Sequence, residues 1–232
     1  MLKNNTIMNR ILYQSSACAV VNKIKGEAAE GAKDGIINLP QELKAFLKTD
    51  FIEAVHRIDV PVTGCALFGL SKTSLEYLNA VFAGKSDLKA EKRYWAILEK
   101  PKNLPPENGE LVHWIETNTR TNKSFAYSDA CAGRKKAVLR YKITGEGKNY
   151  LFMEIEILSG RHHQIRAQLA AAGLHIKGDL KYGAKRSEKS GGIRLHARYL
   201  SFPNPLNKKE TIIVTADPPD MDNLWRAFIN AS

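Results

Sequence analysis

Two stretches of strict alternation constrain the fold of this chain more than any other feature of its sequence. Apolar side chains occupy every second position of residues 136–144 and 150–158, namely Ala137, Leu139, Tyr141 and Ile143, then Leu151, Met153, Ile155 and Ile157. Alternation with a period of two is typical of a strand with one buried face. The glycine-containing segment 145–149 is short enough to join the two runs, so we predict an antiparallel hairpin.

The remaining chain predicts further strands separated by short helices. Strands are expected within 10–23, at 65–70, around 92–96, near 193–201 and at 209–215. Helices are expected within 40–48, from a Thr73–Glu76 capping box up to Gly84, at 162–172 and from about Met221, with a loop at 25–35. This order predicts an α+β fold with a mixed or antiparallel central sheet and flanking helices, in a single domain spanning residues 1–232.

The net charge points to a polyanionic partner. The chain carries 35 Lys and Arg against 24 Asp and Glu, a formal net charge of +11. Residues 161–200 hold nine basic residues and two acids, and so contribute +7 of that charge. Nucleic acid is the first expectation, because basic side chains bind phosphates and release counterions, and an anionic membrane surface is the second.

Cysteine usage and hydropathy indicate a cytoplasmic protein. Cys18, Cys65 and Cys131 show no C-x-x-C spacing, which argues against both a disulfide framework and a zinc site. The N-terminus lacks an apolar leader, and no run approaches the roughly 18 apolar residues of a membrane span. We therefore expect a soluble chain with no membrane partner.

Two polar segments are candidates for chemistry. The first, HRIDVPVTG at residues 56–64, precedes a predicted strand; an Asp beside Pro and Gly fits a turn-former as well as a catalytic carboxylate. The second, residues 160–183, gathers two arginines, three histidines and Gly178-Asp179, and fits a solvated basic helix. Zinc binding by His162, His163 and His175 is disfavoured because no H-E-x-x-H type of spacing is present.

Taken together, these motifs resemble the RluA-type pseudouridine synthase family, in the order the family has them. The family's H-R-L-D-x-x-T-S-G is matched by His56, Arg57, Asp59 and Gly64. Its G-R-x-H-Q-[IL]-R-x-H is matched by the run from Gly160 to Arg166, with Gln168 where a His is usual.

Further pieces extend the resemblance over about residues 10–215. Gly178-Asp179 and Tyr182-Gly183 follow at the family spacing, Lys92–Ala96 and Leu195-His196-Ala197 match strand motifs, and Val21–Gly26 is a variant of V-N-K-P-x-G with Ile24 in the proline position. The resemblance implies the pseudouridine synthase fold with a central RNA-binding cleft. We expect a catalytic domain without the S4 RNA-binding domain that often precedes it.

The resemblance also implies the catalytic residues. Asp59 is the essential carboxylate, acting as a nucleophile on the sugar or the base, or as a base at the ribose. Arg166 supplies the guanidinium that keeps Asp59 ionised. Tyr94 stacks on the target uracil and helps to remove its C5 proton, unless it is an ordinary strand aromatic. No cofactor or metal is expected, since the reaction rearranges bonds within the substrate.

Structured RNA, either ribosomal or transfer RNA, is the expected partner of a monomeric enzyme. Extruding the target uridine costs a few kcal/mol and is easiest in loops or bulges. Arg57 is expected to fill the vacated space or to hold the flipped phosphate. Basic side chains expected to bind the RNA backbone are Lys177, Lys181, Lys185 and Arg186. The other expected RNA-binding residues are His56, Arg161, His163, Gln164 and Leu195, the last of which fits a plain core leucine nearly as well.

Two other classes of function stay open at this point. One is a non-catalytic RNA-binding or ribosome-assembly protein on the same fold, against which the joint presence of Asp59, Tyr94 and Arg166 argues. The other is a metal-dependent nuclease, which predicts inhibition by chelators.

Overall fold

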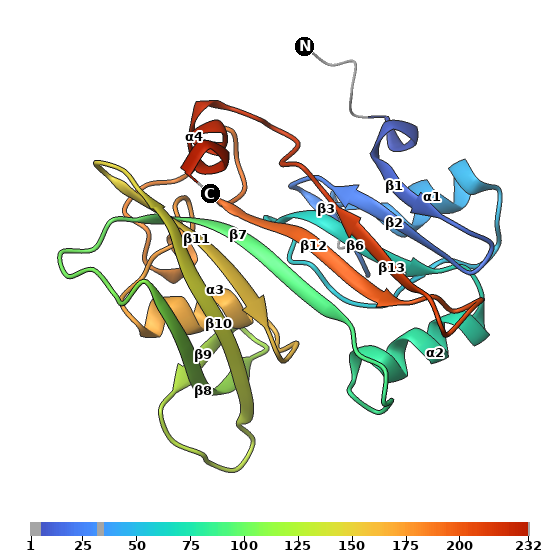
Figure 1. Ribbon diagram of the computed structural model, residues 1–232, viewed down its shortest axis with the longest axis horizontal. Coiled ribbons are helices and arrows are strands. Elements are labelled where there is room, and N and C mark those ends of the chain that lie inside the picture. Colours follow the sequence, from blue (N-terminus) through green and yellow to red (C-terminus); the bar gives the residue numbers. More distant parts are fainter. Residues whose placement is uncertain (1–5, 32–34, 232) are drawn as a thin grey trace. The chain divides into compact units, whose positions relative to one another are not determined.

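The computed structural model describes residues 6–31 and 35–231, which group into two compact units (Figure 1). Unit 1 comprises the described residues up to Lys92 together with Ala197–Asp220. Unit 2 comprises Arg93–His196 and the described residues from Met221 onward. The boundaries fall inside the strands β7 (Glu91–Glu99) and β12 (Leu195–Pro203), so each of these strands contributes to both units.

Unit 1 is built on a sheet with the strand order β1-β2-β6-β12. Its strands are β1 (Ile11–Gln14), β2 (Cys18–Lys23) and β6 (Thr63–Gly69), joined by β13 (Thr211–Thr215) beside β12 and β5 (Glu53–Ala54) beside β6. The strands predicted within 10–23, at 65–70 and at 209–215 are therefore confirmed. The loop predicted at 25–35 contains the short strand β3 (Glu27–Ala28), which pairs with β4 (Ile37–Asn38), and its residues 32–34 lie outside the described residues.

Unit 1 begins with the 3-10 helix η1 (Ile7–Arg10) and contains two of the predicted helices. α1 (Leu39–Leu47) has Pro40 in its first turn, and the side chain of Asn38 accepts a hydrogen bond from the Gln41 amide. α2 (Lys72–Phe82) begins earlier than predicted, because its cap is Ser71 and not Thr73. Ser71 has an extended backbone and its hydroxyl accepts from the amide of Ser74 at 3.2 Å, which is the geometry that an N-cap requires.

The strands of unit 2 form an antiparallel sheet with the order β7-β11-β10-β8-β9. They are β8 (Asn108–Asn118), β9 (Lys123–Tyr127), β10 (Lys135–Glu146) and β11 (Tyr150–Ile157), with β7 as above. The predicted hairpin is confirmed, with Tyr141 opposite Ile155 and an irregularity between Ile143 and Gly145. The sequence did not predict β8 and β9, which extend this sheet beyond the hairpin.

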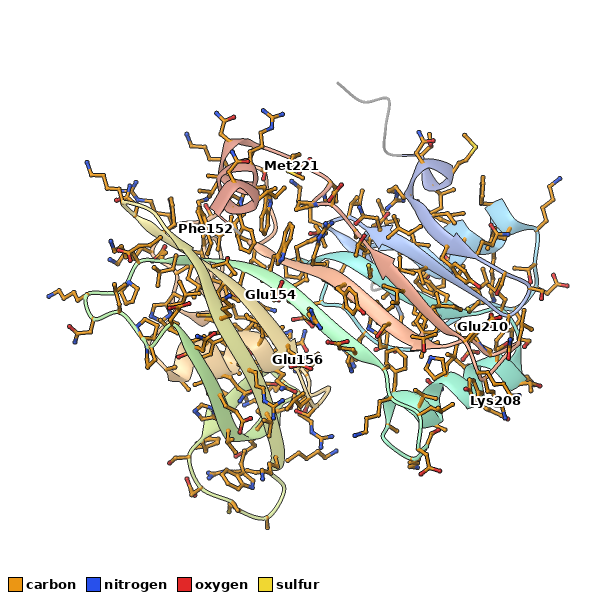
Figure 2. The ribbon with its side chains drawn as sticks, in the orientation of Figure 1. Phe152, Glu154, Glu156, Lys208, Glu210 and Met221 are labelled. Atoms are coloured by element: carbon orange, nitrogen blue, oxygen red, sulfur yellow. The ribbon has the colours of Figure 1, made fainter. Side chains whose placement is uncertain are left out.

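Helices lie on both faces of the unit 2 sheet. α3 (Gln164–Ala171) packs against β8 and β9, and Gly173 follows its C-cap with a positive φ of 73°, as the glycine signal indicated. α4 (Asn223–Ala231) covers the other face, where Phe228 packs on Trp95 and Phe152. Figure 2 labels Phe152 beside this helix. The α+β class with flanking helices is therefore confirmed. Within the described part of the chain, no helix is long and apolar enough to span a membrane.

Candidate active site

The motif HRIDVPVTG forms a tight turn that leads into β6 in unit 1. The amide of Val62 donates to the carbonyl oxygen of Asp59 at 2.9 Å, which closes the turn. Gly64 has φ +113°, and a β-carbon there would collide with the backbone of Ala197 in β12. Glycine is required at this position because the two backbones approach so closely. Asp59 thus sits on a constrained turn beside a sheet, with a partly exposed side chain.

The side chain of Lys23 is hydrogen-bonded to this turn. Its side chain is fully buried, and its Nζ donates to the carbonyl oxygens of Ile24 (3.0 Å), Val60 (3.2 Å) and Val62 (2.6 Å). Burial lowers the pKa of Lys23 to about 8, against the opposing influence of the Glu27 and Asp59 carboxylates. The ammonium therefore ties the turn at residues 59–62 to the Val21–Gly26 segment and places a positive charge in the vicinity of Asp59.

The side chains of His56 and Arg57 lie in different environments. The Nε2 atom of His56 accepts from the amide of Leu67 at 3.4 Å, and its ring stacks on Phe82 with centroids 5.3 Å apart. Burial, followed by the charge of Lys92, lowers the pKa of His56 to about 3, so the ring is neutral. Arg57 is 63% exposed and pairs with Glu30 at 3.0 Å. Its accessibility suits the predicted contact with RNA, whereas the ring of His56 is used in packing.

Arg166 is fixed in unit 2 by a carboxylate to which the sequence had assigned no role. Its Nε and Nη2 atoms donate to the two oxygens of Asp179 at 2.7 and 2.8 Å, and the two side chains are 5% and 1% exposed. A bidentate pair of this kind fixes the plane of a guanidinium. The Gly178-Asp179 motif was the sequence signal that could have identified this partner.

The three histidines of segment 160–183 are engaged with neighbouring protein groups. His162 Nδ1 lies 2.8 Å from Ser124 Oγ, His163 Nδ1 lies 2.9 Å from the Tyr182 hydroxyl, and His175 Nδ1 lies 2.8 Å from the Tyr182 carbonyl oxygen. Each imidazole thus uses its Nδ1 atom in a contact within the protein. Among the described residues, no three His, Cys, Asp or Glu side chains are grouped so as to hold a metal ion.

The two glutamines of α3 attach this helix to the sheet. Gln164 accepts from the Arg161 amide at 3.0 Å and donates to the carbonyl oxygen of Val138 at 3.0 Å. Gln168, at the position where the family motif has His, is fully buried and donates to the carbonyl oxygen of Leu111 at 2.9 Å. In this chain both amides therefore serve the placement of α3.

The predicted phosphate-binding residues fall into two groups. Lys177 is 18% exposed and pairs with Glu188, while Lys181 donates to the carbonyl oxygen of Asn122 at 2.7 Å. Lys185 and Arg186 have exposed side chains, and so does Arg161, whose Nε donates to the carbonyl oxygen of Lys136 at 3.1 Å. The exposed basic side chains are the better candidates for RNA contact, because Lys177 is largely buried together with its partner Glu188.

The proposed catalytic residues belong to both units. Asp59 lies in unit 1, whereas Tyr94 and Arg166 lie in unit 2. Tyr94 is 7% exposed in β7, opposite Ile155 of β11, and its side chain faces away from the surface that α4 covers because its neighbour Trp95 faces α4. Leu195 is 3% exposed in β12. Joint action of these residues in one site and the central RNA-binding cleft both stay predictions.

Relatives of the chain are pseudouridine synthases. Ribosomal large subunit pseudouridine synthase C of Buchnera aphidicola subsp. Acyrthosiphon pisum is 26% identical over 238 residues, which cover 97% of this chain and 73% of that protein. The protein of the same name from Vibrio parahaemolyticus is 26% identical over 213 residues, covering 85% of this chain and 62% of that protein.

Solved structures and a family-wide sequence model agree with these relatives. Human RNA Pseudouridylate Synthase Domain Containing 4 has a TM-score of 0.73 and 22% identity, and the match covers 97% of this chain and 92% of that chain. The expected pseudouridine synthase fold is therefore confirmed. A sequence model described as RNA pseudouridylate synthase matches residues 17–171. Because that match covers more than half of the length of this chain, the chain belongs to the RNA pseudouridylate synthase family.

Proposed function

We propose that this chain isomerises selected uridines in structured RNA to pseudouridine, with Asp59 as the essential carboxylate. The observation that carries the proposal is the position of Asp59 on a turn constrained by Gly64 and by the buried ammonium of Lys23, within the family motif. The reaction breaks the bond between N1 and C1′ and forms one between C5 and C1′. The proton lost from C5 is balanced by one gained at N1, so no oxidant, reductant or co-substrate is needed.

In this proposal Arg166 and Tyr94 complete the site, and the two units act together as one catalytic domain. Arg166 favours the ionised form of Asp59, because an adjacent guanidinium opposes protonation of a desolvated carboxylate. The pair that Arg166 forms with Asp179 supports this role, since it orients the guanidinium before substrate binds. Tyr94 stacks against the extruded uracil.

The proposed substrate is ribosomal RNA, with transfer RNA as the alternative. In this proposal the enzyme is a monomer and acts in the cytoplasm. The relatives named for the ribosomal large subunit favour the first choice. The exposed side chains of Arg57, Arg161, Lys185 and Arg186 support contact with the phosphate backbone. A net charge of +11 supports binding to RNA of either kind.

The test is to map pseudouridines in total RNA from cells that lack the gene and are complemented with wild type, Asp59→Ala or Asp50→Asn. Asp50 is an exposed loop residue of the same unit, which makes it a matched control. We expect wild type and Asp50→Asn to restore the same sites and Asp59→Ala to restore none. Restoration by Asp59→Ala would reject the role of Asp59. RNA binding without any pseudouridine from the wild type would instead favour the non-catalytic alternative.

A further inference from the structure

Tyr182 connects the elements that surround Arg166. It ends the short 3-10 helix η2 (Leu180–Tyr182), three residues after Asp179, and it is 5% exposed. Its hydroxyl, its ring and its backbone each contact a different part of unit 2. A side chain with three separate engagements in one buried place is a candidate for a positioning role.

The hydroxyl of Tyr182 holds the start of α3. It accepts a hydrogen bond from the amide of Ser124 in β9 at 2.8 Å and lies 2.9 Å from His163 Nδ1. His163 precedes α3 in the left-handed backbone conformation, with φ 51°, and its carbonyl oxygen accepts from Ala167 in the first turn of the helix. Non-glycine residues rarely adopt this conformation unless surrounding contacts hold them there. The hydroxyl provides such a contact from β9 to the helix that carries Arg166.

The ring of Tyr182 lies against Arg166 itself. The Arg166 Cζ atom is 4.8 Å from the ring centroid, within the range of a cation–π interaction. Asp179 holds the same guanidinium through two hydrogen bonds, and the amide of Tyr182 donates to the Asp179 carbonyl oxygen at 3.0 Å. A single turn of chain thus presents both a carboxylate and an aromatic face to Arg166.

The backbone at Tyr182 and Gly183 is also constrained. The Tyr182 carbonyl oxygen lies 2.8 Å from His175 Nδ1, and Gly183 follows with φ +97°. A β-carbon on Gly183 would lie 2.7 Å from the imidazole of His175, so any other residue would strain the backbone and displace that ring. The ring of Tyr182 therefore has little freedom to move away from Arg166.

We propose that Tyr182 is a positioning residue for the isomerisation, which orients Arg166 through its ring and secures the start of α3 through its hydroxyl. This inference rests on the proposed function. Tyr182 acts only through Arg166 and does not touch the substrate. Its removal therefore lowers turnover and leaves substrate affinity unchanged, because a guanidinium displaced by about 1 Å loses a large part of its effect on the reacting groups.

The test compares purified Tyr182→Phe and Tyr182→Leu with wild type, using release of the C5 hydrogen from labelled substrate RNA. Tyr77→Phe is the control, because the Tyr77 hydroxyl is buried without a hydrogen-bond partner among the described residues. Kinetics are measured well below the melting temperature of every variant, so that all are folded. We expect kcat to fall about tenfold in Tyr182→Phe, which keeps the ring, and on the order of 100-fold in Tyr182→Leu, with KM within about threefold of wild type.

The results separate this inference from the proposed function. If wild type releases no hydrogen, the proposed function fails, whatever the variants do. If wild type is active and Tyr182→Phe matches it in kcat, or if the loss lies in KM, the positioning role is overturned. Should Tyr182→Leu not fold, Tyr182→Phe alone decides, since it preserves the volume of the side chain.

Discussion

Asp179→Asn is the substitution whose effect the structure determines most directly. Asparagine keeps the shape of aspartate but removes its charge, so the guanidinium of Arg166 is left buried with a neutral partner. The two side chains are 5% and 1% exposed, and therefore water cannot replace the lost interaction. The substitution should weaken both the fold of unit 2 and the orientation of Arg166.

The magnitude follows from the burial of the pair. Removing one partner of a buried ion pair costs roughly 3–5 kcal/mol. The substituted asparagine would still offer one oxygen to Arg166, so the lower end, about 3 kcal/mol, is expected for the free energy of unfolding. For a domain of this size, each kcal/mol lowers the melting temperature by about 2–4 °C, which gives a decrease of roughly 6–12 °C.

Thermal unfolding followed by circular dichroism measures this decrease, with Asp129→Asn as the matched control. Asp129 also pairs with an arginine of unit 2, Arg134, but it is 70% exposed. The control should melt with wild type because solvent screens an exposed pair. If Asp179→Asn melted with the control, the buried pair would not stabilise unit 2 by the expected amount. Turnover of Asp179→Asn should also fall, since Arg166 loses its bidentate support.

Three further predictions follow from the same region. Gly183→Ala should lower the free energy of unfolding by more than about 1 kcal/mol in denaturant titration, because it combines a positive φ with a collision against His175. In RNA-binding titrations, Lys185→Gln should flatten the salt dependence by about 0.7–0.9 in the log–log slope, whereas Lys177→Gln should change it little; equal effects would contradict this. Burial alone would raise the pKa of Glu188, but its partners Arg194 and Lys177 lower it to about 2. Its stabilisation is therefore complete above about pH 4.5 and is lost as the pH falls toward 2, so Glu188→Gln should flatten acid unfolding in that window.

Local sequence patterns predicted those strands and helices in which apolar side chains recur at the spacing that the element itself requires. Residues 136–157 formed the expected hairpin because alternate side chains of both strands enter one core. The strand β9 was missed since its one buried residue is the polar Ser124, which partners distant in sequence satisfy, and β8 was missed since Ile115 is its one buried residue. The capping position of α2 was misassigned by two residues because two hydroxyl residues, Ser71 and Thr73, both fit an N-cap signal.

The sequence by itself determined the fold class, the family resemblance and the turn that carries Asp59, since each depends on residues close together in the chain. Only the tertiary structure revealed that Asp179 binds Arg166 and that Tyr182 joins Ser124, His163 and Arg166. Ser124 and Tyr182 are 58 residues apart, and no periodicity can predict such a contact. Charges and polar groups withdrawn from water must find partners wherever the folded chain places them, and that placement is a property of the packing as a whole.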